Sequence, residues 1–281
     1  MAVEYNGIQL EVIDAHVHTF PDAVAPKAVG KLQRISGITP ATDGTVADTR
    51  RKMDGCGIDR AVLLNIATSP HQQGTINRCA SQLANEPGNR WIPLGSVHFL
   101  AEDSVAELER IAAMGLKGIK LHPDYQGFLI DDERLFPIYE ACSSLGLVIV
   151  FHAGWDCYSP DLIHAQPEAS RRVLRRFPNL KVVLAHFGGL KQWKEVGRYL
   201  IGENVWLDTA MCATYGDAAE IRQMILAHNP KQVLLGSDCP WEDPQKSVRF
   251  VLEMDLPDEQ KQRILSRNAK ELYGLSGVDN R

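Results

Sequence analysis

Short apolar runs rich in β-branched residues alternate along the chain with longer amphipathic stretches. There are eight such runs, and they predict eight strands at residues 12–20, 60–67, 91–98, 118–123, 147–154, 181–188, 205–211 and 233–241. Strands that alternate with helical stretches are typical of βα units around a parallel sheet. Eight of them within 281 residues predict a closed (β/α)8 TIM barrel of the α/β class. An open doubly wound sheet would be favoured by a G-x-G-x-x-G motif after a strand, and the sequence has none.

Several stretches between these runs carry the signals of helix ends. One helix is expected to begin at Asp103-Ser104 and to end at Gly115. Another is expected to end at Gly146, and Pro137 is expected to disturb its first turns.

The stretch from 21 to 48 is long and rich in Pro, Gly, Thr and Ala. It follows the first predicted strand, so in a barrel it would lie over the active-site face as a lid or substrate loop. The chain shows no internal repeat and no second-domain boundary. Residues 1–281 are therefore predicted to form a single domain.

Charge and hydrophobicity limit the classes of partner. The formal net charge of −5 gives no electrostatic reason to expect nucleic acid. The arginines at positions 171, 172, 175 and 176 are spaced as one solvated helix face rather than as a phosphate-binding patch. No apolar run approaches the roughly 20 residues that a membrane-spanning helix needs, so no membrane partner is expected.

The cysteines and the N-terminal residues indicate the cellular compartment of the protein. The six cysteines show no C-x-x-C spacing, and the first residues have no basic segment followed by an apolar core. Free cysteines without a signal peptide are typical of a reducing environment, so the sequence predicts a cytoplasmic protein.

Polar side chains collect where the predicted strands end. His16 and His18 lie two residues apart on one strand and therefore share a face. His152, His186 and Asp238 end the fifth, sixth and eighth strands. Carboxyl ends of barrel strands form the active-site face. Residues two and four positions earlier are expected to fill the barrel below them: Val148 and Val150, Val182 and Leu184, Leu234 and Gly236.

Three imidazoles and one carboxylate suit zinc or a related divalent ion. Such an ion can lower the pKa of water from 15.7 to about 7. Asp238 could accept the proton as general base, and His186 could orient the water or stabilise charge on a substrate oxygen. An unpaired carboxylate at Asp238 would be costly to bury, which favours metal or salt-bridge duty.

The other histidines have simpler interpretations. His98 and His228 are expected to be hydrogen-bonded core or surface residues, because a single histidine in a barrel is more often that than a ligand. His71 and His164 fall in predicted loops or helix starts, where a solvated side chain is the default.

Lys120 and His122 share a face at the end of the fourth strand. Lys120 could contact a substrate carboxylate or oxyanion. It could equally be a structural lysine paired with Asp14, because a buried lysine needs a counter-charge. His122 is a candidate substrate contact, and Trp241 could form a pocket wall or simply pack beneath the next helix.

The motifs together resemble a known family. DAHVHTF, GIKLHP, VFHAG, AHFGG, GSDCPW and the closing RILSRNAKELYGL occur in this order from the first strand to the last helix. They resemble the amidohydrolase superfamily, and within it the amidohydrolase-related branch that includes aromatic and semialdehyde decarboxylases. The ordered set is highly specific for the superfamily and much less so for the reaction.

The resemblance implies a set of metal ligands. It places one metal on His16, His18, His152 and Asp238, with His186 beside the metal-bound water. Zinc is expected, with Mn²⁺ or Fe²⁺ as alternatives. The setting of Lys120 is also similar to the carbamylated lysine of dihydroorotase-like members, which would imply two metals; we expect one.

Three functions follow as hypotheses. The first is hydrolysis of an amide, ester or lactone of a small molecule, with Asp238 as base and His186 and Lys120 assisting the carbonyl. The second is non-oxidative decarboxylation of a small carboxylic acid, with Asp238 or His186 protonating the carbon. The third is a non-catalytic metal-binding scaffold, although none of the expected ligands is missing. The resemblance also implies a homo-oligomer.

Overall fold

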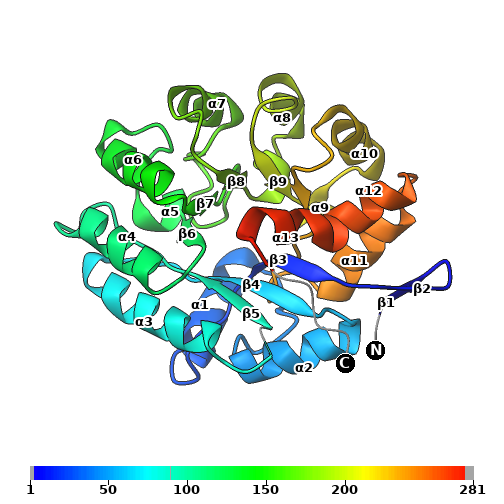
Figure 1. Ribbon diagram of the computed structural model, residues 1–281, viewed down its shortest axis with the longest axis horizontal. Helices are drawn as coiled ribbons and strands as arrows, with labels where there is room; N and C mark the ends of the chain where they lie inside the picture. Colours follow the sequence, from blue (N-terminus) through cyan, green and yellow to red (C-terminus); the bar gives the residue numbers. More distant parts are fainter. Residues whose placement is uncertain (1–2, 89, 276–281) are drawn as a thin grey trace.

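A ring of parallel strands forms the centre of the protein. The computed structural model describes residues 3–88 and 90–275. Within them, eight parallel strands follow one another around the ring (Figure 1): β3 (Ile13–Val17), β4 (Arg60–Leu64), β5 (Trp91–Leu94), β6 (Gly118–Leu121), β7 (Val148–Phe151), β8 (Val182–Leu184), β9 (Trp206–Asp208) and β10 (Val233–Leu234). The predicted (β/α)8 barrel is confirmed.

Backbone hydrogen bonds close the ring at two places. The strands pair as β3-β4-β5 and as β6-β7-β8-β9-β10. Gly95 joins the first group to the second, since Lys120 N–H donates to the Gly95 carbonyl at 2.9 Å. On the other side His18 N–H donates to the Cys239 carbonyl at 2.7 Å. The second closure brings the ends of β3 and β10 together.

Most of the helices surround the strands (Figure 1). A short antiparallel hairpin, β1 (Val3–Tyr5) and β2 (Ile8–Leu10), precedes the barrel. The helices are α1 (Ala25–Ser36), α2 (Val46–Cys56), α3 (Gln73–Ala84), α4 (Ser104–Ala113), α5 (Pro123–Gln126), α6 (Phe136–Leu145), α7 (Pro167–Arg176), α8 (Trp193–Tyr199), α9 (Cys212–Tyr215), α10 (Ala218–Ala227), α11 (Pro244–Glu253), α12 (Asp258–Gln262) and α13 (Asn268–Tyr273). Among the described residues, no helix has the length and hydrophobicity needed to cross a bilayer.

Prolines lie in the first turns of two helices, and the expectation that Pro137 disturbs its helix was wrong. The stretch from 21 to 48 contains helix α1, with Pro26 in its first turn, and the beginning of α2. Pro137 lies in the first turn of α6, which begins at Phe136. Proline is compatible with the first turn of a helix, because the N–H groups there have no partner within the helix.

The barrel interior is filled by one apolar cluster. Its members come mainly from alternate strand positions and from α13, which crosses the centre of the ring in Figure 1: Ile13, Ala15, Val62, Leu64, Ile92, Leu94, Val148, Val150, Val183, Leu234, Ala269, Leu272 and Tyr273. The cluster fills the lower part of the barrel and leaves polar side chains at the carboxyl ends of the strands.

One layer prediction for the barrel interior was wrong. In β8 it is Val183 that joins the interior cluster, whereas Val182 and Leu184 belong to the outer core between strands and helices. Strict alternation from Val183 would therefore direct His186 outward. The chain leaves the strand at this point with φ 57° at His186 and 54° at Phe187, and this left-handed backbone turns the imidazole inward.

Gly154, just after His152, allows a close crossing of two segments. Its φ is +89°, and a Cβ there would lie 2.0 Å from the Leu190 nitrogen. We expect Gly154→Ala to cost about 3 kcal/mol or more, because steric overlap adds to backbone strain. Gly127→Ala is the control, because Gly127 has φ +74° but no atom within 4 Å of the added Cβ. It should cost only about 1 kcal/mol. Denaturant unfolding measures both, and equal losses would contradict the crowding at Gly154.

His228 follows α10 and is buried. Gly202 N–H donates to its Nδ1 at 3.2 Å, and its Nε2 donates to the Val205 carbonyl at 2.9 Å. Burial lowers the pKa of His228 below 6.5, so the folded state favours the neutral ring. The unfolded chain then binds the proton first, and this stability is present above pH 6.5 and lost as pH falls below it.

We expect His228→Gln to lose less stability than the wild type when pH is lowered from neutral towards mildly acidic values. Thermal unfolding over this pH range is the measurement. The exposed His71→Gln is the control and should keep the wild-type pH profile. An unchanged profile in His228→Gln would show that the ring titrates alike in both states.

Candidate metal centre

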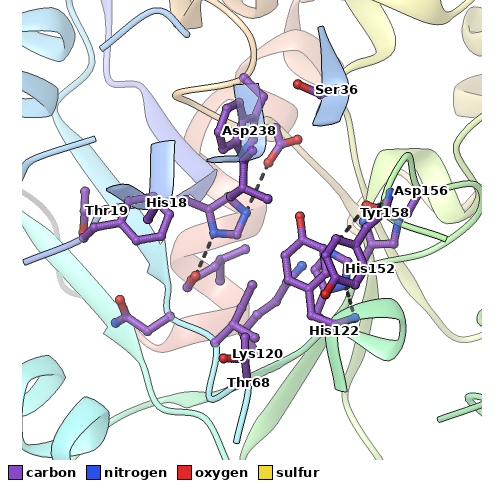
Figure 2. Close-up of a pocket in the computed structure, with 18 of the residues that line it drawn as sticks. His18, Thr19, Ser36, Thr68, Lys120, His122, His152, Asp156, Tyr158 and Asp238 are labelled. Atoms are coloured by element: carbon purple, nitrogen blue, oxygen red, sulfur yellow. Dashed lines mark hydrogen bonds and ion pairs between the residues drawn. The ribbon is translucent and has the colours of Figure 1, made fainter. Parts of the chain in front are cut away.

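Three side chains meet where β3 and β10 end. His16 Nε2 lies 3.2 Å from His18 Nε2 and 3.3 Å from Asp238 Oδ1. His18 Nε2 lies 3.2 Å from the same Asp238 oxygen (Figure 2). All three residues are at least nine-tenths buried. We call His16, His18 and Asp238 the ligand triangle.

The hydrogen bonds on the far side of each ring fix its tautomer. His16 Nδ1 lies 2.9 Å from Asp208 Oδ2, and His18 Nδ1 lies 2.8 Å from the Leu64 carbonyl oxygen. Carbonyl and carboxylate oxygens only accept, so each Nδ1 carries the hydrogen and each Nε2 carries a lone pair. Metal-binding histidines are held in this way by carboxylates and carbonyls.

Three lone pairs therefore face one another across the ligand triangle. Burial favours the neutral acid at Asp238, but the neighbouring histidines, His16 foremost, hold its pKa below the ordinary value. Burial, and then the charge of Lys120, lowers the pKa of His16 well below its usual range. An ionised carboxylate beside two neutral rings repels them unless a cation lies between. The edges match the roughly 3.3 Å between ligands of a tetrahedral zinc ion with bonds of about 2.0 Å.

His186 and His152 lie beside the ligand triangle. The ligand atoms of His16, His186 and Asp238 all lie within 4.8 Å of one another. His186 Nδ1 donates to the Ala210 carbonyl at 3.2 Å, and His186 Nε2 lies 3.0 Å from His152 Nδ1. Since His186 Nδ1 carries the hydrogen, His152 Nδ1 must donate to His186 Nε2. His152 as a ligand of this ion stays a prediction.

The backbone is irregular at these positions. Asp238 has φ 70°, and the pairing of β3 with β4 shifts between Asp14 and Val17, around His16. A left-handed conformation costs a non-glycine residue about 1–2 kcal/mol, and such strain concentrates at functional sites. The strained positions direct the ligand triangle into the barrel.

Lys120 is completely buried at the end of β6, and its Nζ has no hydrogen-bond partner among the described residues. Burial lowers its pKa to about 8, against the opposing charges of Asp208, Asp238 and Asp156. Pairing with Asp14 was one of two interpretations and is wrong. Asp14 accepts instead from the Ser237 hydroxyl and from the N–H groups of Ser237 and His16.

The sequence patterns did not identify three buried aspartates of the site. Asp208 ends β9 and holds both His16 Nδ1 and the His186 N–H. Asp124 and Asp156 follow β6 and β7 by a few residues. An acidic residue directly after an apolar run, as in WLD, was the available signal for Asp208. Asp124 and Asp156 lie in connecting segments, where an acidic residue is ordinarily solvated.

The remaining histidines differ in environment. His98 is buried and accepts from the Leu100 N–H, and His228 is hydrogen-bonded in the core, as described above. His71 is exposed at the cavity lining. The expected solvated side chain is wrong for His164, whose Nδ1 lies 3.0 Å from Asp124 Oδ1 and whose side chain is 11% exposed.

The ligand triangle opens into a cavity of about 740 Å³. Lys120, His122 and Trp241 also line it, together with residues of α1 and the segments around it. Its walls are largely apolar or aromatic: Phe20, Val24, Ala28, Leu32, Ile38, Leu64, Ile66, Ile76, Tyr125, Trp155, Tyr158, Leu190, Met211, Tyr215 and Trp241. The volume is sufficient for a small organic substrate.

Comparisons with known proteins identify the family of the chain. The sequence model of a family described as Amidohydrolase matches residues 13–275. The 2-amino-3-carboxymuconate-6-semialdehyde decarboxylase of Dictyostelium discoideum is 28% identical over 241 residues, 71% of this chain. That alignment spans 66% of the relative, just under two thirds of its length.

Two solved structures show the same fold. The 5-carboxyvanillate decarboxylase LigW of Sphingomonas paucimobilis has a TM-score of 0.72 at 18% identity, covering 95% of this chain and 100% of that one. The 5-carboxyvanillate decarboxylase of Novosphingobium aromaticivorans, solved with manganese and a nitrobenzoic acid, has a TM-score of 0.71 at 17% identity, covering 95% and 96%.

We expect Asp208→Asn to lower metal affinity about 10- to 100-fold, because an amide can offer N–H to His16 Nδ1 in place of a fixed acceptor. Competition with a chromophoric chelator near neutral pH measures the affinity. Asp217→Asn, the same change at the exposed N-terminus of α10, is the control. Wild-type affinity in Asp208→Asn would contradict the tautomer assigned to His16.

Proposed function

The chain belongs to the amidohydrolase family, and we propose that it is a metal-dependent decarboxylase that releases the carboxyl group of a small carboxylic acid as carbon dioxide. It is an enzyme of that superfamily, which sets aside the scaffold hypothesis. Hydrolysis was the first hypothesis from the sequence. The relative in Dictyostelium discoideum favours the alternative, because it is a decarboxylase.

One observation carries the proposal: two centres of positive charge would face a single, largely apolar cavity. The ligand triangle fits a divalent cation, and Lys120 has an ammonium group with no hydrogen-bond partner. Both line the cavity. The carboxylate group of a substrate would supply negative charge that pairs with these two positive centres. Decarboxylation releases neutral carbon dioxide, which apolar walls favour, and leaves the negative charge on the substrate carbon until a proton neutralises it.

The ligand triangle would supply three protein ligands to such an ion, the number that is typical of catalytic zinc sites. A divalent ion held there would contribute positive charge that binds substrate oxygens and stabilises charge developing on the substrate. The identity of the ion is part of the proposal, with zinc or manganese suited to imidazole and carboxylate ligands.

Lys120 and His186 have separate roles in this proposal. Lys120 binds and orients the substrate carboxylate from the floor of the cavity. When the bond to the carboxyl carbon breaks, its electron pair stays on the substrate carbon, which must gain a proton. His186 Nε2 accepts from His152 Nδ1 in the structure, so it would deliver that proton after first taking one up, while Nδ1 stays bound to the Ala210 carbonyl. Trp241, His122 and the segment around α1 would shape the pocket around the substrate.

Hydrolysis of an amide, ester or lactone is the second candidate. The observation that favours it is the low pKa of Asp238, which keeps this carboxylate ionised and able to accept a proton from water. The two reactions use the same residues and differ in the product.

We expect the metal-loaded protein to release carbon dioxide from at least one acid in a panel of hydroxybenzoates and unsaturated semialdehyde acids. Lys120→Met keeps the length of the side chain and removes its charge, so kcat/KM should fall about 100-fold or more. Lys117→Met is the matched control, because Lys117 is exposed just before β6. Cleavage of an amide, ester or lactone without carbon dioxide release would overturn the proposal in favour of hydrolysis.

A further inference from the structure

The hydroxyl group of Tyr125 has no hydrogen-bond partner among the described residues, although its side chain is partly buried. Tyr125 lines the same cavity as the ligand triangle and Lys120. Shielded tyrosine hydroxyls usually have a partner. Tyr139, in the core, is an example, since its hydroxyl donates to the Ile130 carbonyl at 2.7 Å. The hydroxyl of Tyr125 is therefore available to a ligand in the cavity.

The local backbone fixes the position of the Tyr125 ring. Tyr125 lies in the single helical turn α5, which follows β6, and Pro123 occupies the first position of this turn. The residue before the turn, His122, caps it, because its Nδ1 accepts from the Tyr125 N–H at 3.4 Å. The two rings stack with their centroids 3.6 Å apart and an angle of 5° between their planes. The cap and the stack together direct the Tyr125 side chain.

The turn itself is anchored to the ends of neighbouring strands. Gln126 Nε2 donates to the Ala67 and Val97 carbonyls, at 2.9 Å in each case. The Oε1 atom of the same side chain accepts from the His122 N–H at 3.0 Å. A group that is held in place before a ligand arrives loses little conformational freedom when it binds. The Tyr125 hydroxyl is preorganised in this sense.

Aromatic rings on the same side of the cavity restrict the Tyr125 ring further. The ring of His152 stacks on that of His122, with the centroids 4.3 Å apart (Figure 2). Tyr158, which is 45% exposed, meets the Tyr125 ring edge to face, with the centroids 5.1 Å apart and the planes at 68°. Contacts on the ring leave the hydroxyl as the part of the Tyr125 side chain that lacks an interaction.

The Tyr125 hydroxyl keeps its hydrogen at neutral pH. The ordinary pKa of tyrosine is about 10. Burial raises the pKa of Tyr125 well above that value, and the nearby carboxylates of Asp156 and Asp238 raise it further. An uncharged phenol can donate its hydrogen to an acceptor, and no described residue supplies one. The group therefore suits a ligand that carries an acceptor atom.

We propose that the Tyr125 hydroxyl donates a hydrogen bond to an oxygen atom of the substrate other than the oxygens of the carboxyl group that is lost. The ligand triangle and Lys120 already provide for that carboxyl group. The inference rests on the proposed function, because it takes the ligand to be a carboxylic acid. It narrows the substrate class to acids with a second oxygen, in a hydroxyl or carbonyl group, and makes Tyr125 a specificity-determining residue.

The test is the binding of benzoate and of its 2-, 3- and 4-hydroxy derivatives to the whole metal-loaded protein, measured by calorimetric titration. We expect the wild type to bind at least one hydroxy acid more tightly than benzoate. Tyr125→Phe keeps the ring and removes the hydroxyl, so this preference should fall about 5- to 10-fold while the affinity for benzoate is unchanged. Tyr215→Phe is the matched control and should keep the preference, because Tyr215 lines the same cavity but is 38% exposed.

Carbon dioxide release from the same acids tests the proposed function separately. A preference that survives in Tyr125→Phe overturns the inference, and so does the absence of any preference in the wild type. An equal loss of affinity for benzoate and for the hydroxy acids also overturns it, because Tyr125 would then only shape the pocket. A preference lost in Tyr125→Phe supports the inference even where no acid releases carbon dioxide. Carbon dioxide release with the preference unchanged supports the proposed function and overturns the inference.

Discussion

The repulsion between buried lone pairs is the constraint on which the site depends. His16 Nε2, His18 Nε2 and Asp238 Oδ1 face one another at 3.2–3.3 Å, and none has a hydrogen to share. The arrangement persists because Asp208 and the Leu64 carbonyl hold the far sides of the rings. Barrel closure between the ends of β3 and β10 then brings the acid to the imidazoles. A cation bound between these three atoms would remove the repulsion.

The apolar surroundings of the ligand triangle strengthen the electrostatic interactions made there. The lower barrel is packed with aliphatic side chains, and the cavity above is lined largely by apolar and aromatic groups. Electrostatic interactions are stronger in such a medium than in water. Lys120 and the buried aspartates therefore interact strongly across the cavity floor, which suits chemistry in which a substrate loses or redistributes charge.

Irregular backbone places several of the reactive groups. His186 and Asp238 both have positive φ, and Gly154 permits the chain after His152 to cross beside Leu190. These positions follow regular strands whose lower residues pack in the barrel. The regular strands thus hold the backbone in place, and a few strained residues at their carboxyl ends direct side chains into the cavity.

The sequence by itself determined the barrel, because apolar periodicity and strand count depend only on local spacing. It also placed His16, His18, His152, His186 and Asp238 at strand ends. It could not assign the partners of Asp208, Asp124 or Asp156, since these partners are distant in the chain and meet only in the ring. Tertiary structure alone decided that Lys120 does not pair with Asp14, that α1 occupies the expected loop, and which face His186 presents. Burial and long-range contact set these outcomes, and neither is encoded in local spacing.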